Sequence, residues 1–204
     1  MNRYDPVKRA LDVVAAALAL ILTSPVQGVV ALAVLVRLGP PVLFVQKRPG
    51  RHGTVFGILK FRSMRAPVGG EETDAARLGA FGRALRATSL DELPSLVNVL
   101  RGEMSFVGPR PLLVSYLDRY SAEQSRRHEV RPGLTGLAQV SGRNLVPWDE
   151  RLRLDVEYVD RRSFALDAAI VARTIGVIFR RRGISSANSV TRGEFLGPGR
   201  SNDV

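Results

Sequence analysis

An apolar stretch from Val13 to Val36 constrains the fold of this chain most. As a continuous helix, its roughly 24 residues would be about 36 Å long, which is enough to cross a bilayer core of about 30 Å. Ser24 and Pro25 interrupt the middle of the stretch, and a proline inside a helix removes a backbone hydrogen bond and forces a bend. The Ser24 hydroxyl can bond a carbonyl that Pro25 leaves free. We therefore expect a membrane helix with a Ser-Pro break over residues 1–40.

Basic residues flank this stretch on both sides, with Lys8 and Arg9 before it and Arg37, Lys47 and Arg48 after it. Because the cytoplasmic flanks of membrane segments carry an excess of Lys and Arg, both ends are expected on the cytoplasmic side. A broken helix that enters and leaves through the same face satisfies both the bend and the charge pattern. The favoured topology is therefore a re-entrant helix followed by a small domain that faces the cytosol.

Two other topologies stay open from the sequence alone. A helix that crosses the bilayer once would leave either a short tail or the whole basic domain outside, against the charge pattern. A cleaved signal peptide would find a small-residue cleavage site at Ala31-Leu32-Ala33, although apolar residues continue through Val36.

Composition narrows the classes of function. The chain has no cysteine and only two histidines, His52 and His128, which excludes disulfide scaffolds and leaves few ligands for the usual zinc clusters. The formal net charge of +11 suits nucleic acid, anionic lipid headgroups or phosphorylated small molecules. Aromatic residues make up 6% of the chain, which is little for stacking on single-stranded bases. Composition therefore leaves membrane lipids, phosphorylated molecules and nucleic acid open, although we do not expect nucleic acid as a partner.

The pattern after residue 40 predicts an α/β domain that is mostly helical and carries a small β-hairpin. Strands are expected at residues 42–45 and 55–59, and helices at 75–86, 93–100, 114–130, 149–160 and 163–179. The last helix leads into Arg180-Arg181-Arg182, so it either lies on an anionic membrane surface or packs in the core with a solvated basic end. We assign residues 41–182 to one domain with amphipathic helices and expect a loosely ordered tail over 183–204.

Two adjacent acids, Asp91 and Glu92, open the helix expected at 93–100. Its apolar positions follow the i, i+3, i+4, i+7 spacing and are Leu93, Leu96, Val97 and Leu100. Ser89 followed three residues later by Glu92 is typical of a capping box, which places Asp91 in the first turn, where an anion is favoured. Acids are common in first turns, so the pair becomes a catalytic hypothesis only together with the arginines around it.

Arginines beside conformationally fixed backbone are the second half of this hypothesis. Arg110 lies between two prolines and Arg131 precedes a third, so each guanidinium can present its fork to phosphate oxygens at a lower ordering cost. Arg62, Arg86 and Arg143 are further candidates of the same type. The sequence has no P-loop, no Gly-x-Gly-x-x-Gly turn and no Asp-x-Asp pair. This argues against a nucleoside triphosphatase, a dinucleotide enzyme and a common metal-dependent glycosyltransferase.

Several short motifs form a specific set by their order and spacing. They are Lys8-Arg9 with Asp12, Ser24-Pro25, Gln46-Lys47-Arg48-Pro49-Gly50, Lys60-Phe61-Arg62-Ser63-Met64, Ser89-Leu90-Asp91-Glu92-Leu93-Pro94, Gly108-Pro109-Arg110-Pro111 and Arg131-Pro132-Gly133-Leu134-Thr135-Gly136. With this set, the chain resembles the monotopic polyprenyl-phosphate phosphoglycosyl transferases, the bacterial sugar transferase family, over nearly its whole length. Lys47 departs from the family pattern, and the chain resembles the short form of the family.

The resemblance implies that the protein transfers a phosphosugar from a UDP-sugar to polyprenyl (undecaprenyl) phosphate and releases UMP, as the first membrane step towards an exopolysaccharide or another glycoconjugate. Asp91 is implied as the nucleophile of a covalent phosphosugar-aspartate intermediate and as the ligand of Mg²⁺, the implied cofactor. Glu92 is its partner carboxylate and a candidate proton carrier, because adjacent acids raise one pKa of the pair. The implied location is the bacterial inner membrane, with the catalytic domain on the cytoplasmic face.

The residues expected to bind phosphate are the arginines named above and Lys60 of the Lys60–Met64 motif. They are Lys60, Arg62, Arg86, Arg110, Arg131 and Arg143. A homodimer is left open. The competing interpretation is a basic membrane-associated module that binds nucleic acid or anionic lipid without catalysis.

Overall fold

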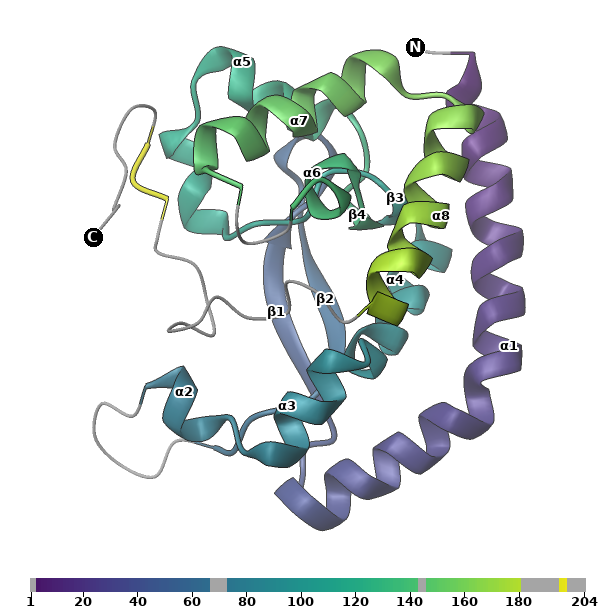
Figure 1. Cartoon of the computed structure of the whole chain (residues 1–204), viewed down its shortest axis with the longest axis vertical. Coiled ribbons are helices and arrows are strands. Elements are labelled where there is room, and N and C mark those ends of the chain that lie inside the picture. The colour runs from purple at the N-terminus through teal and green to yellow at the C-terminus, as the bar shows by residue number, and fades with distance from the viewer. Residues whose placement is uncertain (1–2, 67–72, 143–145, 181–194, 198–204) are drawn as a thin grey trace.

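The computed structural model of the chain describes residues 3–66, 73–142, 146–180 and 195–197 (Figure 1). The elements in chain order are α1 (Tyr4–Leu38), β1 (Leu43–Pro49), η1 (Arg51–Gly53), β2 (Val55–Phe61), α2 (Asp74–Arg77), α3 (Ala80–Ala87), η2 (Leu90–Ser95), α4 (Leu96–Arg101), β3 (Ser105–Val107), η3 (Val114–Arg119), α5 (Ala122–Ser125), η4 (Arg126–Glu129), β4 (Gly133–Thr135), α6 (Leu137–Val140), α7 (Trp148–Arg161) and α8 (Phe164–Arg180), where η marks a 3-10 helix.

The long helix α1 runs along one side of the molecule and curves beneath it (Figure 1). The antiparallel hairpin β1–β2 stands at the centre, with η2 packed against β2 and α4 packed against α1. A second small sheet pairs β3 with β4 in parallel. Helices α5 and α7 cover one end, and α2 and α3 lie at the other. The expectation of a mostly helical α/β fold with a hairpin is therefore confirmed in the described residues.

Helix α1 is one continuous α-helix of 35 residues, so the expected break at Ser24-Pro25 is a bend within the helix. Pro25 has no N–H to bond the Ile21 carbonyl, and the Ser24 hydroxyl donates to that carbonyl at 2.8 Å. The Thr23 hydroxyl donates to the Ala19 carbonyl at 2.6 Å. Because these side chains bond carbonyls at the bend, the helix turns without ending.

Most of the apolar surface of α1 is exposed. Its most apolar window of 18 residues is only 11% buried, and Leu22 and Val36 are 77% and 73% exposed. Ala16, Val30 and Val34 are the apolar α1 residues that are buried against the domain. By length and composition α1 could cross a membrane, and its exposed face is suited to lipid.

The first turns of α1 are fastened to three other elements. Lys8 pairs with Asp167 of α8. Arg9 donates to the carbonyl of Val99, at 2.6 Å, and to that of Leu100, both in α4. Asp12 is 5% exposed and accepts the N–H of Phe106 in β3 at 3.1 Å. The Lys8-Arg9 and Asp12 motif therefore docks the long helix on the domain.

The other end of α1 is held by Arg62, which follows β2. Its guanidinium donates to the carbonyls of Leu38, Gly39 and Pro40, the last at 3.0 Å. The last carbonyls of a helix have no partner within the helix, and a cation also complements the negative end of the helix dipole. Arg62 therefore closes the C-terminus of α1 and is not turned towards a phosphate site as expected.

Polar side chains of η2 and α4 bind the backbone of β2. Asn98 is fully buried, accepts from Leu59 N at 3.0 Å and donates to the Gly57 carbonyl at 2.8 Å. Ser95 donates to the Leu59 carbonyl at 2.6 Å. These bonds use the β2 groups that β1 does not pair, and they place the acids of η2 beside Lys60.

Two glycines allow the loop after β3 to pack on β4. A Cβ on Gly133 would lie 2.1 Å from Gly108 N, and a Cβ on Gly108 would lie 2.4 Å from the Arg131 carbonyl. Both distances are far below van der Waals contact, so any side chain would push the strands apart. The glycines of the two Pro-Gly motifs thus fix the position of the loop that carries Arg110.

Two of the expected helices are confirmed and two others are replaced by shorter ones. The helices expected at 149–160 and 163–179 are confirmed as α7 and α8. The single helix expected at 114–130 is wrong, because η3, α5 and η4 occupy this range, and the one expected at 75–86 is divided into α2 and α3. Ser121 begins α5 with a complete capping box, which starts a new helix inside the expected one.

Part of the C-terminal tail is packed on the domain. Phe195 is 1% exposed, and its ring contacts those of Tyr116, Tyr120 and Trp148 at centroid distances of 5.5–5.6 Å. The Phe195 N–H also donates to the Tyr116 hydroxyl at 3.2 Å. The tail is therefore not loosely ordered at this residue, while residues 181–194 and 198–204 lie outside the described part.

We predict that Arg62→Met lowers the melting temperature of the detergent-solubilised protein by several degrees. The substitution leaves three carbonyls at the end of α1 without their donor, at a cost of about 1–3 kcal/mol. Arg65→Met is the matched control, because Arg65 is exposed and its side chain donates to one carbonyl, that of Ala76. Equal melting temperatures of the two variants would contradict the anchoring role of Arg62.

Candidate active site

The acids Asp91 and Glu92 lie in the 3-10 segment η2, not in the first turn of an α-helix. Ser89 has a φ of 56° and its side chain makes no capping hydrogen bond, so the predicted capping box is wrong. The physical reason is that cations from distant segments bind the Glu92 carboxylate. Helix α4 begins only at Leu96 and has six residues, which corrects the helix expected at 93–100.

Glu92 is held by two cations. Its Oε1 is 2.6 Å from Lys60 Nζ of β2 and 3.2 Å from Arg110 Nη2. Burial by itself would raise the pKa of Glu92, but the charges of Arg110 and Lys60 outweigh it and hold this pKa at about 2. Glu92 is therefore ionised at neutral pH, which contradicts its expected role as a proton carrier.

Asp91 has the opposite environment. It is 7% exposed, and burial first and the charge of Glu92 second raise its pKa to about 6, against the opposing charges of Lys60, Arg86 and Arg110. No hydrogen bond or ion pair engages its carboxylate within the described residues. The raised pKa expected for one acid of the pair thus belongs to Asp91, whose oxygen lone pairs are left available for chemistry.

Arg86 reaches this region from α3. Its Nε donates to Ser63 Oγ at 2.9 Å, and its charge acts on Asp91. The approach of α3 depends on Gly82, since a Cβ there would lie 1.9 Å from the Ser63 carbonyl. Arg110 is 45% exposed and free to meet a ligand. Lys60, Arg86 and Arg110 therefore surround Asp91 with positive charge, as the sequence predicted.

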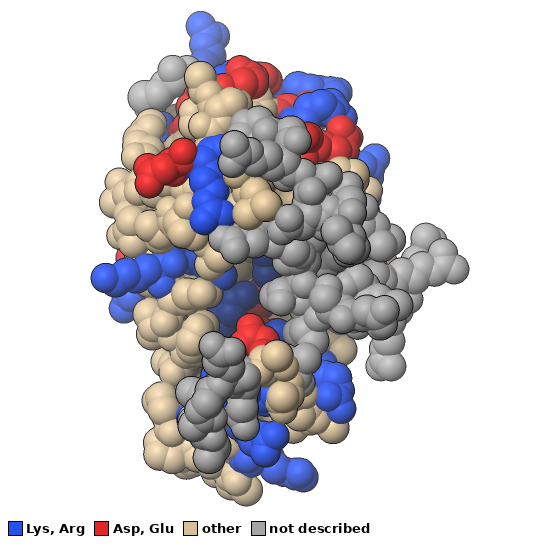
Figure 2. Space-filling model, turned by 90° about the vertical axis from the view of Figure 1, so that its left-hand side faces the viewer, with Lys and Arg blue, Asp and Glu red and all other residues tan. Residues whose placement is uncertain are grey.

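Figure 2 shows the face of the molecule with α2 and α3 towards its lower end, where basic side chains gather inside a central hollow. Cations gathered in a hollow concentrate the field on an anionic ligand. The placement agrees with a site for a phosphorylated substrate.

Two expected phosphate ligands, Arg62 and Arg131, do not join this site. Arg62 closes the end of α1. Arg131 donates through Nε to the Gly102 carbonyl at 2.7 Å, beyond the far end of α4 from Asp91, and Arg9 lies on the same glycine. Arg143 lies outside the described residues. The proline after Arg131 therefore fixes an arginine that helps to hold the C-terminal end of α4 and does not bind phosphate at this site.

Arg48 is a neighbour of the site that the sequence reasoning missed. It is partly buried in β1, and Nη2 donates to Gln46 Oε1 at 2.6 Å. Burial first and the charge of Arg110 second lower its pKa to about 10, so the two guanidinium groups lie near each other. The signal was the position of Gln46 and Arg48 two residues apart on one face of a strand.

The acids fit a magnesium ion only together with a substrate. Among the described residues no group of three or more His, Asp or Glu side chains could hold a metal by itself. Mg²⁺ usually binds one or two carboxylates and completes its shell with phosphate oxygens and water. Asp91 supplies one free carboxylate, whereas that of Glu92 is engaged by Lys60 and Arg110.

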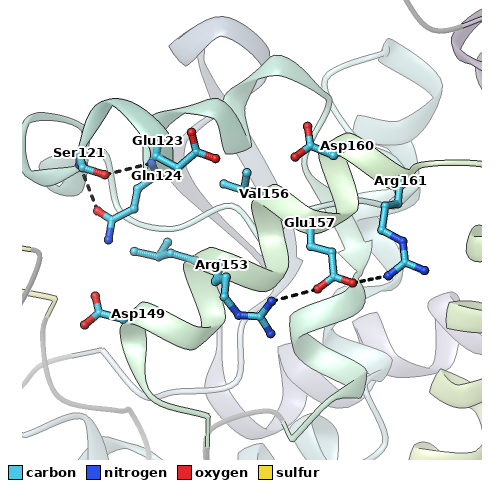
Figure 3. A pocket seen from close by; sticks show the side chains of 10 residues that line it. Ser121, Glu123, Gln124, Asp149, Arg153, Val156, Glu157, Asp160 and Arg161 are labelled. Carbon is cyan, nitrogen blue, oxygen red and sulfur yellow. Dashed lines mark hydrogen bonds and ion pairs between the residues drawn. The ribbon is translucent and has the colours of Figure 1, made fainter.

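A separate groove of about 700 Å³ lies between α5 and α7 (Figure 3). Two of its lining arginines pair with Glu157, which is 2.6 Å from Arg161 and 3.3 Å from Arg153. Asp91 does not line it. The groove therefore has no part in the chemistry of the acid pair.

Comparison with known proteins identifies the family. The family model described as bacterial sugar transferase matches residues 3–181. The chain is 46% identical over 195 residues to the uncharacterized sugar transferase EpsL of Bacillus subtilis, covering 94% of this chain and 96% of that protein. It is 44% identical over 181 residues to a UDP-glucose:undecaprenyl-phosphate glucose-1-phosphate transferase of Caulobacter vibrioides, covering 82% and 68%.

A third relative is the exopolysaccharide production protein ExoY of Rhizobium meliloti, which is 39% identical over 196 residues, with 86% of this chain and 87% of that protein covered. The family match extends from the start of α1 to the end of α8 and includes the acid pair with its surrounding cations. The chain therefore belongs to the bacterial sugar transferase family.

Proposed function

We propose that the protein transfers a sugar phosphate from a UDP-sugar to polyprenyl phosphate and releases UMP, with Asp91 as the nucleophile. The observation that carries the proposal is the buried, unpaired carboxylate of Asp91 beside Glu92, which Lys60 and Arg110 hold ionised. The printed activity of the Caulobacter relative supports this reaction type, and the name of ExoY supports an exopolysaccharide pathway.

The transfer proceeds in two displacements. An Asp91 oxygen attacks the phosphorus that bears the sugar, the bond from this phosphorus to the bridging oxygen breaks, and UMP leaves with that oxygen. A phosphate oxygen of polyprenyl phosphate then attacks the same phosphorus, and the bond to Asp91 breaks. The carboxylate is regenerated and the product is a polyprenyl diphosphate sugar.

The cations around Asp91 make the first displacement feasible. A carboxylate nucleophile and a diphosphate repel each other, so positive charge must lie on the substrate oxygens before attack. Arg110 and Arg86 are placed to bind these oxygens, and Lys60 keeps the negative charge of Glu92 in place. Mg²⁺ is the expected cofactor, which when bound would neutralise diphosphate charge, with Asp91 as its protein ligand.

The covalent intermediate also suits the position of the site beside a membrane helix. A water-soluble donor and a lipid acceptor can use one pocket in turn, because the first product leaves before the second substrate binds. In this proposal the exposed apolar face of α1 is inserted in the inner membrane as a re-entrant helix, and the domain rests on the cytoplasmic face.

We predict that Asp91→Asn abolishes UMP release, by about a thousandfold or more, because an amide is a poor nucleophile for phosphorus. The assay incubates purified protein with a panel of UDP-sugars, Mg²⁺ and polyprenyl phosphate and measures UMP, and the panel identifies the donor. Asp160→Asn is the control, an exposed acid of α7 that pairs with Arg126. Full turnover by Asp91→Asn would refute the role of Asp91, and a wild-type protein that releases no UMP would favour a binding module.

The pH dependence follows from the pKa of Asp91, about 6. Only the ionised carboxylate attacks phosphorus, so kcat/KM should rise about tenfold per pH unit below pH 6 and level off above it. Glu92, with a pKa of about 2, adds no inflection in this range. A profile that stays flat down to pH 4.5 would show that Asp91 is not the group whose ionisation limits the rate.

The re-entrant topology predicts that both ends of α1 face the cytoplasm. Single cysteines at Asn2 and at Thr54, an exposed position next to Gly53, should both react with a thiol reagent in inside-out vesicles and both be protected in intact cells. The chain has no native cysteine to interfere. Labelling of the two positions from opposite faces would instead show that α1 crosses the bilayer.

A further inference from the structure

A series of buried contacts holds Arg110 from the side opposite to the acids. Arg127 of η4 is 2% exposed and donates through Nη2 to the Arg110 carbonyl at 2.7 Å. The same guanidinium meets Asp155 Oδ2 of α7 through Nη2 at 2.7 Å and Nε at 3.1 Å. Arg110 then reaches Glu92 with its own guanidinium at 3.2 Å. The series therefore connects α7 to the acid beside Asp91.

The Arg127–Asp155 ion pair does not have the geometry that binds a carboxylate most strongly. An arginine fork that binds a carboxylate best meets both oxygens. Here Asp155 Oδ2 takes both bonds, while Oδ1 is buried without a hydrogen-bond partner among the described residues. An unpaired buried carboxylate oxygen is costly. The Arg127 guanidinium is oriented so that Nη2 also donates to the Arg110 carbonyl. Its orientation therefore fits the position of the loop that carries Arg110.

The rest of this loop is fixed in the same way. The Pro109 carbonyl accepts from Gly133 N at 3.0 Å, and the rings of Pro109 and Pro111 restrict the backbone on both sides of Arg110. With the Arg110 carbonyl held by Arg127, the direction of its Cα–Cβ bond is set. The side chain of Arg110 is the part of the loop left free to move to a ligand.

We propose that Arg127 and Asp155 are positioning residues that aim the Arg110 guanidinium at the substrate diphosphate. The proposal rests on the proposed function, in which Arg110 binds that diphosphate. The side chains of Arg127 and Asp155 are both 1% exposed, so neither touches a ligand and both act through the Arg110 carbonyl.

A double-mutant cycle separates positioning from a general loss of stability. Arg127→Lys keeps a charge opposite Asp155, but a single ammonium cannot replace the fork that serves both Asp155 and the Arg110 carbonyl. We expect Arg127→Lys to lower kcat/KM for UMP release about tenfold, and to cause no further loss in a protein that already carries Arg110→Ala. The same fold loss in both backgrounds, or no loss in either, would overturn the proposal.

Two further variants keep the test decisive. Asp155→Asn retains the shape of the carboxylate and should show the same dependence on Arg110, so it decides the question if Arg127→Lys does not fold. Arg126→Lys is the matched control on η4, because its partners Glu123 and Asp160 are exposed, and it should leave kcat/KM unchanged. Thermal melting of each variant verifies the fold.

The same double-mutant cycle can be measured by ligand binding, without any enzymatic turnover. Calorimetry with inorganic diphosphate and Mg²⁺ should show binding weakened about tenfold by Arg127→Lys when Arg110 is present, and unchanged when Arg110 is alanine. Equal weakening in both backgrounds would reject the positioning role. A wild-type protein that binds diphosphate but releases no UMP from any UDP-sugar would reject the proposed function, and the cycle would still decide the role of Arg127.

Discussion

The ion pairs of Glu92 with Lys60 and Arg110 determine what the neighbouring carboxylate can do. Two adjacent acids in a poorly hydrated place cannot both keep ordinary pKa values. The two cations favour the charged form of Glu92. Burial and the charge of Glu92 therefore raise the pKa of Asp91 instead. The pair therefore has a fixed charge and a reactive group, and sequence adjacency alone does not say which residue takes which part.

Strand β2 and the residue after it connect the acid pair to the long apolar helix α1. Lys60 contacts Glu92 and Arg62 binds the last carbonyls of α1, two positions further along the chain. Residues two apart in extended chain are about 7 Å apart. The end of α1 and the acid pair are thus held at a short, nearly fixed separation.

Local sequence patterns were enough to predict α7, α8, the hairpin and the bend at Pro25, because each depends on residues close in sequence. Local signals failed where tertiary charge competed with them. Ser89 and Glu92 have capping-box spacing, but the capping bond was lost because Lys60 and Arg110 bind Glu92 more strongly than a backbone N–H would.

The candidate site was predicted in part for the same reason. The structure brings three of the expected cations close to Asp91: Lys60, Arg86 and Arg110. In contrast, Arg62 and Arg131 donate to backbone carbonyls. An arginine beside a proline is equally suited to a phosphate and to a helix end, and only the folded chain decides between them.

The buried ring of Phe195 changes where the domain ends. A boundary drawn after residue 182 would remove this ring from the cluster of Tyr116, Tyr120 and Trp148 and expose the aromatic faces that it covers. Newly exposed aromatic surface promotes self-association in a protein that already carries an apolar helix. The functional unit of this chain therefore extends at least to Phe195, and a shortened protein without it would be harder to keep dispersed.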